Sequence, residues 1–181
     1  MTISNTLYSS RSEEWATPSN FFAALDREFS FTLDPCATRL NAKCARYFTK
    51  RQDGLTQDWG RRRVFCNPPY GRAMRDWARK CFEASRQGAL VVLLAHARTD
   101  TRWFHDWVYG KASEIRFVRG RLRFGDGTQS APFPSLVAIY RPASDIPMIV
   151  AATATPRRPM TTHMDRAAGE RDRNNSGRTT A

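Results

Sequence analysis

The chain has 181 residues, of which 41% are apolar and 12% aromatic, enough for one folded domain with a sizeable core. Its 29 basic and 17 acidic residues give a formal net charge of +12, and only four of the basic residues are lysines. Because guanidinium groups bind phosphates and base edges bidentately, this arginine excess favours a polyanionic partner. No apolar run reaches the roughly 18 residues of a transmembrane helix, and residues 1–11 lack the apolar stretch of a signal peptide. We therefore expect a cytoplasmic protein without a membrane partner.

The cysteines and histidines show no metal-binding spacing. The four cysteines stand at positions 36, 44, 66 and 81, without a C-x-x-C pair, and the three histidines form no H-E-x-x-H motif. The sequence therefore predicts no metal site and no disulfide framework, but reduced, partly buried thiols.

The first predicted elements are a helix and a short strand. Residues 1–12 are polar and are expected to form a flexible N-terminus. Thr17 is suited to cap a helix with Pro18 at its first position. Phe21, Phe22, Leu25 and Phe29 then follow at helical spacing over about three turns. Residues 31–33 predict a short strand that ends at Asp34-Pro35.

The middle of the chain alternates strands and helices. Residues 39–63 are polar and basic and predict an irregular connection with room for one short helix. A brief buried strand over 64–66 is stopped by two adjacent prolines. An amphipathic helix carrying Met74, Trp77 and Cys81 follows, then a fully buried strand over 89–94. Asp100 can cap a further helix that carries Trp103 and Phe104.

The C-terminal part predicts strands over 115–118, 122–124 and 136–140, linked by turns that contain Gly and Pro. Residues 151–181 have no aromatic side chain and are expected to form a disordered basic tail. We therefore predict one α/β domain over 13–150, with a mostly parallel sheet and a C-terminal β-hairpin.

The tetrapeptide Asn67-Pro68-Pro69-Tyr70 carries the clearest chemical signal. It follows an apolar strand, where open α/β sheets bind ligands. The Asn67 side-chain oxygen and the Pro68 carbonyl can accept both hydrogens of an exocyclic amine, and this directs the nitrogen lone pair towards an electrophile. Pro68 and Pro69 fix the backbone, and Tyr70 offers a face on which a planar base can stack. The alternative is a rigid turn in which Tyr70 only packs.

Several segments in this order resemble the DNA N6-adenine methyltransferases, specifically the small phage-encoded group related to Dam. The resemblance covers about residues 13–141 and rests on these segments: Glu14 to Pro18, Phe31 to Pro35, Asp53 to Leu55, Asp58-Trp59, Asn67 to Tyr70, Ala97 to Phe104, Gly120 to Phe124 and Ala131 to Ser135. It implies a Rossmann-like methyltransferase fold that uses S-adenosylmethionine, and it implies that Asn67, Pro68, Pro69 and Tyr70 bind a flipped adenine.

The resemblance also implies a set of cofactor-binding residues. It places Trp15, Thr17 and Pro18 at the amino-acid end of the cofactor, Asp34 and Pro35 in the first cofactor motif, and Asp58 near the cofactor's adenine. A helix N-terminus suits a carboxylate, although Thr17 can equally be a plain helix cap and Asp58 a capping residue. The usual glycine-rich first motif is missing, because no glycine lies between Asp34 and Gly54.

Five arginines are candidates for DNA contact. In an extended strand Arg119, Arg121 and Arg123 share one face, opposite Val118, Leu122 and Phe124, which gives a basic face suited to phosphates. Arg116 belongs to the same predicted cluster. Arg61 stands beside the catalytic strand, and Arg98 follows the central strand, where it can line the cleft.

Together these features predict a DNA adenine-N6 methyltransferase that flips an adenine out of duplex DNA and methylates it from S-adenosylmethionine. Two alternatives stay open at this stage. One is methylation of another planar amine, such as cytosine N4 or a glutamine amide. The other is a catalytically inactive DNA-binding module of the same fold, which the missing glycines favour. The oligomeric state is not predicted.

Overall fold

The structure is a computed structural model that describes residues 15–125 and 130–145. The predicted flexible N-terminus (1–12) and the predicted basic tail (151–181) lie outside these ranges. The helices are α1 (Ser19–Phe29), α2 (Met74–Arg86) and α3 (Arg102–Trp107), with a 3-10 turn η2 at Ala143–Asp145. The strands are β1 (Arg63–Cys66), β2 (Leu90–His96), β3 (Glu114–Phe117) and β4 (Ser135–Tyr140).

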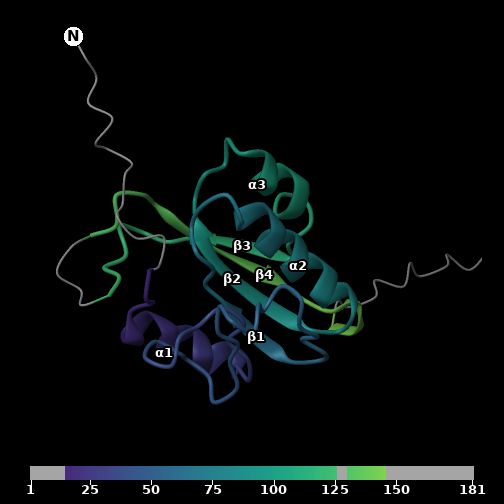
Figure 1. The fold of residues 1–181 in the computed structure, drawn as a ribbon. Coiled ribbons are helices and arrows are strands. Elements are labelled where there is room, and N and C mark those ends of the chain that lie inside the picture. Colours follow the sequence, from purple (N-terminus) through teal and green to yellow (C-terminus); the bar gives the residue numbers. More distant parts are fainter. Residues whose placement is uncertain (1–14, 126–129, 146–181) are drawn as a thin grey trace, which may run out of the picture. The chain divides into compact units, whose positions relative to one another are not determined.

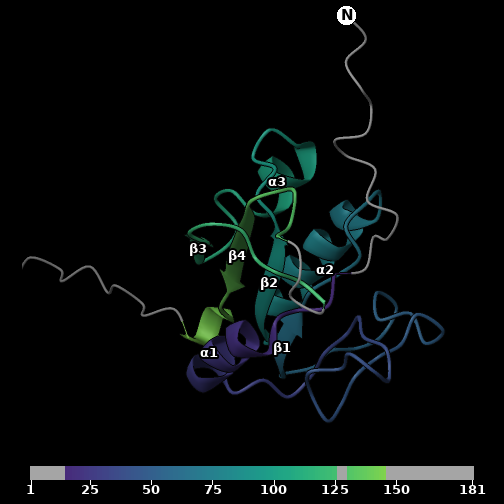
Figure 2. The ribbon, with the colours of Figure 1, turned by 90° about the vertical axis from the view of Figure 1, so that its left-hand side faces the viewer.

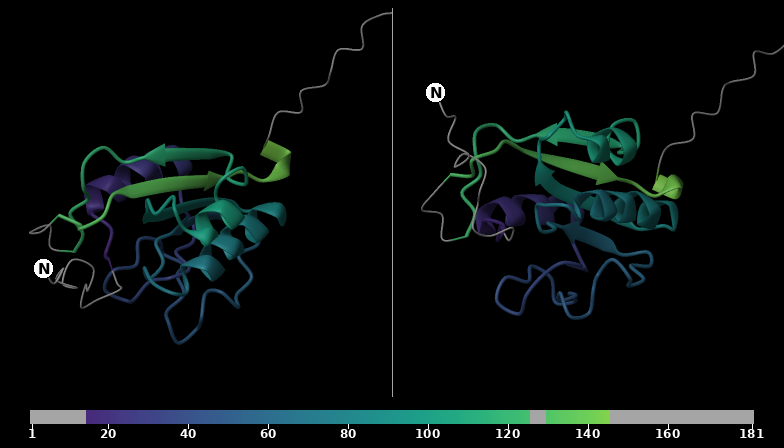
Figure 3. Two further views of the ribbon diagram at one scale, coloured as in Figure 1. Left: turned by 90° about the horizontal axis from the view of Figure 1, so that it is seen from above. Right: turned by 45° about the horizontal axis from the view of Figure 1, so that its top comes forward.

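The four strands form one mixed sheet in the order β1-β2-β4-β3 (Figure 1). β1 pairs with β2 in parallel, whereas β4 runs antiparallel to both of its neighbours, β2 and β3. Figure 3 shows β3 and β4 pointing in opposite directions. The prediction of a mostly parallel sheet is therefore corrected, since two of the three strand ladders are antiparallel.

Two of the predicted strands are not present as regular strands. Around residues 31–33 the chain forms only isolated bridges, Leu33 to Val64 and Asp34 to Tyr47. Residues 122–124 form no strand, although Leu122 and Phe124 are buried and the residues beside them are exposed. The predicted alternation of burial is present there without a partner strand. Residues 39–62 are irregular and contain no helix.

The helices cover the two faces of the sheet, with α1 on one face and α2 and α3 on the other (Figures 1 and 2). On the first face Phe22 of α1 packs edge-on against Phe65 of β1, with ring centroids 5.0 Å apart. On the second face α2 buries Met74, Trp77, Ala78 and Cys81, as its helical spacing predicts. β2 and β4 lie between these layers and are buried at every position except His96.

The helix starts differ from the prediction by one residue each. Pro18 rather than Thr17 is the N-cap of α1, and Thr101 rather than Asp100 is the N-cap of α3. The side chain of Asp100 pairs instead with Arg98, at 3.3 Å. The hydroxyl of Thr17 is therefore available for a contact outside the helix.

None of the helices in the described ranges has the length and apolar character needed to cross a bilayer. Within the same ranges no three His, Cys, Asp or Glu side chains gather closely enough to hold a metal ion.

Candidate active site

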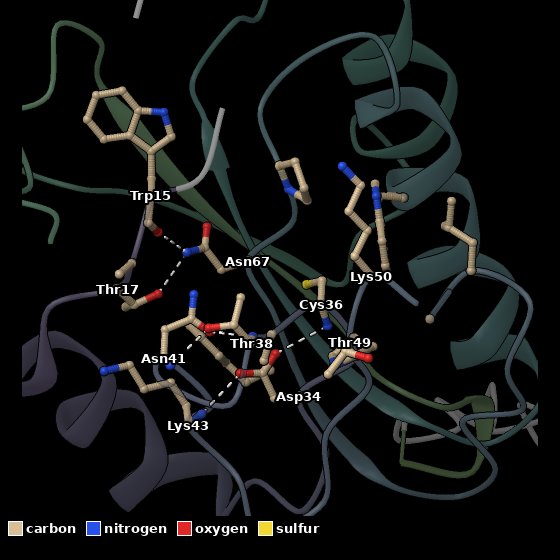
Figure 4. A pocket seen from close by; sticks show the side chains of 18 of the residues that line it. Trp15, Thr17, Asp34, Cys36, Thr38, Asn41, Lys43, Thr49, Lys50 and Asn67 are labelled. Carbon is tan, nitrogen blue, oxygen red and sulfur yellow. Dashed lines mark hydrogen bonds between the residues drawn. The ribbon is translucent and has the colours of Figure 1, made fainter. Parts of the chain in front are cut away.

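A cavity of about 540 Å³ opens at the carboxyl end of β1 (Figure 4). Of the predicted site residues, Trp15, Thr17, Asp34, Pro35, Asn67 and Pro69 line it. Two further polar lining residues stand in segments of the family resemblance: Thr38, in the first cofactor motif that begins at Asp34, and Asp53. The sequence had given no indication of the remaining ones, Asn41, Lys43, Thr49 and Lys50. The cavity therefore brings segments 15–17, 34–43, 49–55 and 67–69 together.

Asn67 is fixed by two hydrogen bonds at one end of this cavity. Its Nδ2 donates to the Trp15 carbonyl oxygen at 2.6 Å and to Thr17 Oγ1 at 2.9 Å. These two acceptors orient the amide so that Oδ1 points to the same side as the Trp15 indole and away from Asp34 (Figure 4). Oδ1 is buried, and no donor in the described part of the chain reaches it. A buried acceptor without a partner carries a desolvation cost, so this oxygen is prepared for an N–H group from outside the protein.

Thr17 thus helps to position Asn67 instead of capping α1. It is buried, at 5% exposed, and it lies beside the cavity. Pro18, one residue further, is the backbone N-cap of α1 and is absent from the described lining residues.

Asp34 is the buried carboxylate of the cavity, at 5% exposed. Its Oδ1 accepts the Cys36 backbone N–H at 3.3 Å, and Oδ2 accepts the Lys43 backbone N–H at 3.1 Å. Desolvation raises the pKa of Asp34, and the two backbone N–H groups oppose that effect only in part. A cationic group placed in the cavity would therefore be attracted to this carboxylate.

The segment around Gly54 closes the cavity from another side. A Cβ on Gly54 would lie 1.9 Å from the Pro35 carbonyl oxygen, so only glycine permits this close approach. Asp53 and Leu55 beside it line the cavity, whereas the predicted Asp58 does not. Asp58 is exposed and accepts the Gly60 N–H at 2.8 Å, so its structural position is that of a turn residue.

Tyr70 is buried and packs among other aromatic rings, outside the described lining of the cavity. Its ring stacks on His96 with centroids 5.2 Å apart and an interplanar angle of 14°, and His96 stacks in turn on Trp103. Burial lowers the pKa of His96 to about 4, with Arg98 adding to the effect, so the imidazole is neutral near pH 7. Pro68 is buried as well, while Pro69 lines the cavity.

The cysteines near the site lie in surroundings that disfavour a reactive thiolate. All four cysteines are free, and Cys36 Sγ lies 3.8 Å from Cys66 Sγ. Burial raises the pKa of the Cys66 thiol well above its usual value, which disfavours the nucleophilic thiolate.

The arginines divide into two groups. Arg119, Arg121 and Arg123 are exposed, and Arg121 lines a second hollow of about 430 Å³ together with Arg98, Asp100 and Phe133. Arg116, predicted to join them, is instead held by Glu28 and Glu114.

Arg61 stands beside β1, as the sequence indicates, but at the end of the strand away from Asn67. It precedes β1, whereas Asn67 follows it, so the two residues flank opposite ends of a four-residue strand. At about 3.3 Å per residue, they lie on opposite edges of the sheet. The Arg61 side chain packs near Gly88.

Comparison with known proteins identifies the family. The family model described as DNA N-6-adenine-methyltransferase (Dam) matches residues 4–171. A protein of Haemophilus phage HP1 named DNA N-6-adenine-methyltransferase is 31% identical over 150 residues, which cover 78% of this chain and 86% of that protein. A protein of the same name from Escherichia phage T1 is 27% identical over 110 residues, or 60% of this chain and 45% of that protein. The family implies S-adenosylmethionine as methyl donor and DNA as substrate. The chain therefore belongs to the DNA N-6-adenine-methyltransferase (Dam) family.

Proposed function

We propose that the protein transfers a methyl group from S-adenosylmethionine to the N6 amino group of adenine in DNA. The observation that carries this proposal is the side chain of Asn67: its amide nitrogen is held by Trp15 and Thr17, and its oxygen is left without a partner among the described residues, beside a cavity.

The cavity suits the cofactor in size and in chemistry. Its volume of about 540 Å³ lies within the range of roughly 300–1,000 Å³ that is usual for small-molecule sites. The amino-acid end of S-adenosylmethionine carries an ammonium and a carboxylate. The Asp34 carboxylate can bind the ammonium, and Lys43 or Lys50, on the same lining, can bind the carboxylate. The cofactor, when bound, supplies a sulfonium methyl group as the electrophile.

Asn67 and Pro68 act on the amine that is to be methylated. Asn67 Oδ1 accepts one N6 hydrogen, and the Pro68 carbonyl is the proposed acceptor for the other. Holding both hydrogens turns the nitrogen lone pair out of conjugation with the purine ring. Because the amide is already fixed, little reorganisation remains when the base arrives. N6 loses a proton only after it has gained the methyl group, so no strong general base is required.

Tyr70, in this proposal, stacks on the flipped base, and Arg98, Arg119, Arg121 and Arg123 bind the DNA backbone. Exposure and an excess of positive charge support the assignment of the three arginines over 119–123. The Rossmann-like fold that the family implies is also part of the proposal. The parallel β1–β2 pair, with the catalytic segment at its carboxyl end, supports it.

The test combines calorimetry with mass spectrometry. S-adenosylmethionine should bind the purified protein in a 1:1 complex, and DNA incubated with both should yield N6-methyladenine on nucleoside analysis. Detection of N4-methylcytosine would instead identify cytosine N4 as the methylated amine. No measurable cofactor binding would favour an inactive DNA-binding module. Sequencing of the methylated DNA would identify the recognition site.

A further inference from the structure

The catalytic acceptor lies near a group of the protein's own aromatic side chains. Asn67 Oδ1 is buried, although a substrate amine has to reach it. Oδ1 points to the side of the Trp15 indole (Figure 4), and this indole belongs to a group of four rings. Trp15 contacts Phe124 and Phe133 with centroids 5.5 Å and 5.2 Å apart, and Tyr70 lies 6.2 Å and 5.3 Å from the same two rings. We call this set (Trp15, Tyr70, Phe124 and Phe133) the aromatic cluster.

Three members of the aromatic cluster are held by the framework. The Trp15 carbonyl accepts a hydrogen bond from Asn67, and Tyr70 stacks on His96. Phe133 stands between Pro132 and Pro134, whose rings restrict the backbone on both sides of it. These contacts hold the backbone of Trp15 and Phe133 and the ring of Tyr70.

Phe124 differs because its own segment presents arginines on the outside. Over residues 121–124, Arg121 and Arg123 are exposed while Leu122 and Phe124 are buried. No strand within residues 15–125 and 130–145 pairs with this segment. Its described backbone hydrogen bonds are from the Gly125 N–H to the Ala16 carbonyl at 2.9 Å and from the Ala131 N–H to the Leu122 carbonyl at 2.8 Å. Because few described backbone hydrogen bonds hold this segment, a displacement of Arg121 and Arg123 would also move Phe124.

We propose that Phe124 occupies the place of the flipped adenine in the DNA-free enzyme and withdraws when Arg121 and Arg123 bind the DNA backbone. Phe124 is then a specificity-determining residue: it limits methylation to adenines delivered by bound DNA and excludes free nucleosides. This inference rests on the proposed function. Phe124 meets Tyr70 edge-on, with an interplanar angle of 89°, so its ring fills space beside Trp15 and Tyr70 without the parallel stacking that a purine would make on Tyr70.

The test compares two substrates, a DNA duplex that carries the recognition sequence and free 2′-deoxyadenosine. The wild type should methylate the duplex and leave the nucleoside almost untouched. In Phe124→Ala the vacated ring space can bind a base directly, so kcat/KM for deoxyadenosine should rise roughly tenfold, in line with base–aromatic stacking. The ratio of kcat/KM for duplex over nucleoside should therefore fall.

Phe29→Ala is the matched control, since Phe29 is equally buried but lies at the far end of α1, beside Arg63. It should change kcat/KM for both substrates alike. Phe124→Leu retains more of the packing and should give a smaller effect of the same sign if the alanine variant is unstable. An unchanged ratio, or an equal loss on both substrates, would overturn the proposal.

A second measurement follows the segment itself. Binding of duplex DNA to the wild type should speed hydrogen exchange at the Gly125 amide, because withdrawal of Phe124 breaks its bond to Ala16. Slower exchange at that amide would contradict the inference. Absence of any methylation by the wild type would instead remove the proposed function, so the two failures are distinguishable.

Discussion

The two edges of the sheet differ in how completely their polar groups are paired. At the edge where β1 begins, Arg63 donates to the Phe29 carbonyl at 2.9 Å, and Arg116 donates to both Glu28 carboxylate oxygens at 2.6 Å and 2.7 Å. Arg141 lies 3.9 Å from Glu114 at the same edge. At the opposite edge lie four of the five buried polar atoms that have no partner among the described residues: Asn67 Oδ1, the Tyr70 hydroxyl, His96 Nδ1 and Ser135 Oγ. The fifth is Nε1 of Trp107, a residue whose carbonyl accepts the Tyr140 hydroxyl near the first edge.

This difference separates structural from functional groups. Pairing within the chain stabilises the first edge, whereas the second edge keeps acceptors that a ligand can satisfy. Arg119, Arg121 and Arg123, which follow β3 towards the second edge, have no carboxylate partner in the described ranges, unlike Arg116 at the first. A buried acceptor left unpaired is a better candidate for binding than one already satisfied, and the three exposed arginines can pair with phosphates.

The largest expected effect concerns the two arginine groups. Replacing Arg119, Arg121 and Arg123 together by Gln should weaken DNA binding by roughly two orders of magnitude at low salt. It should also reduce the salt slope by about 0.9 for each phosphate that the protein no longer neutralises. Fluorescence anisotropy over a salt series measures both quantities. The paired variant Arg116→Gln/Arg141→Gln is the control and should leave the slope unchanged. Equal slopes for the two variants would remove the distinction between the arginine groups.

The next effect concerns the buried carboxylate. Asp34→Asn should weaken binding of S-adenosylmethionine roughly 10- to 100-fold, the range expected for loss of a hydrogen bond to a charged group. In the wild type, affinity should decline as pH falls, because the methionine ammonium needs Asp34 ionised. Since burial raises the pKa of Asp34, this decline should begin at a higher pH than for an exposed aspartate. Calorimetry at several pH values tests both statements, and Asp58→Asn is the matched control. Equal affinities of the two variants would contradict the proposed contact.

A smaller effect concerns acid stability. The pKa of His96 is lowered to about 4, so the unfolded chain binds a proton at a higher pH than the folded one. Stability should therefore decrease as pH falls through the window between the ordinary histidine pKa and about 4. His96→Phe keeps a ring between Tyr70 and Trp103 but does not titrate, so its Tm should decrease less over that window. An identical loss of Tm in both proteins would assign the acid sensitivity to other groups.

The smallest effect is expected at the paired edge. Arg116→Ala removes contacts to Glu28 and Glu114 that are partly exposed, so it should lower the free energy of unfolding by about 1 kcal/mol or less. Urea unfolding measures this value. A loss of DNA affinity in the same variant would show that the paired edge also takes part in binding.

Elements with a strong local pattern could be predicted from the sequence. The spacing of Met74, Trp77 and Cys81 predicts α2, and the unbroken apolar run before His96 predicts β2. The direction of β4 could not be predicted in this way, because a buried strand has the same apolar composition in either orientation. The alternation at Leu122 and Phe124 predicts a strand, but these side chains are buried without a ladder, and Phe124 packs within the aromatic cluster.

The sequence predicted the site residues that belong to recognisable motifs. It did not predict those that reach the cavity only because the fold brings distant segments together. Asn67, Asp34 and Thr17 belong to motifs and do lie around one cavity. Lys43, Thr49 and Lys50 had no signal of their own, because they come from the irregular stretch that the fold brings beside Asp34. Asp58 was implied by the family resemblance, and Arg61 was chosen because it stands beside β1. Asp58 is an exposed turn residue, and Arg61 lies at the end of β1 away from Asn67.

The central claim, that Asn67 presents its amide oxygen to adenine N6, is tested most directly by Asn67→Ala. DNA treated with the variant and S-adenosylmethionine is digested, and N6-methyladenine is measured by mass spectrometry, with DNA affinity and cofactor affinity determined in parallel. We predict that methyl transfer falls by at least about a hundredfold, similar to removal of one preorganised hydrogen-bonding group in other active sites, with DNA binding retained. Undiminished N6-methyladenine formation by the variant would contradict the account.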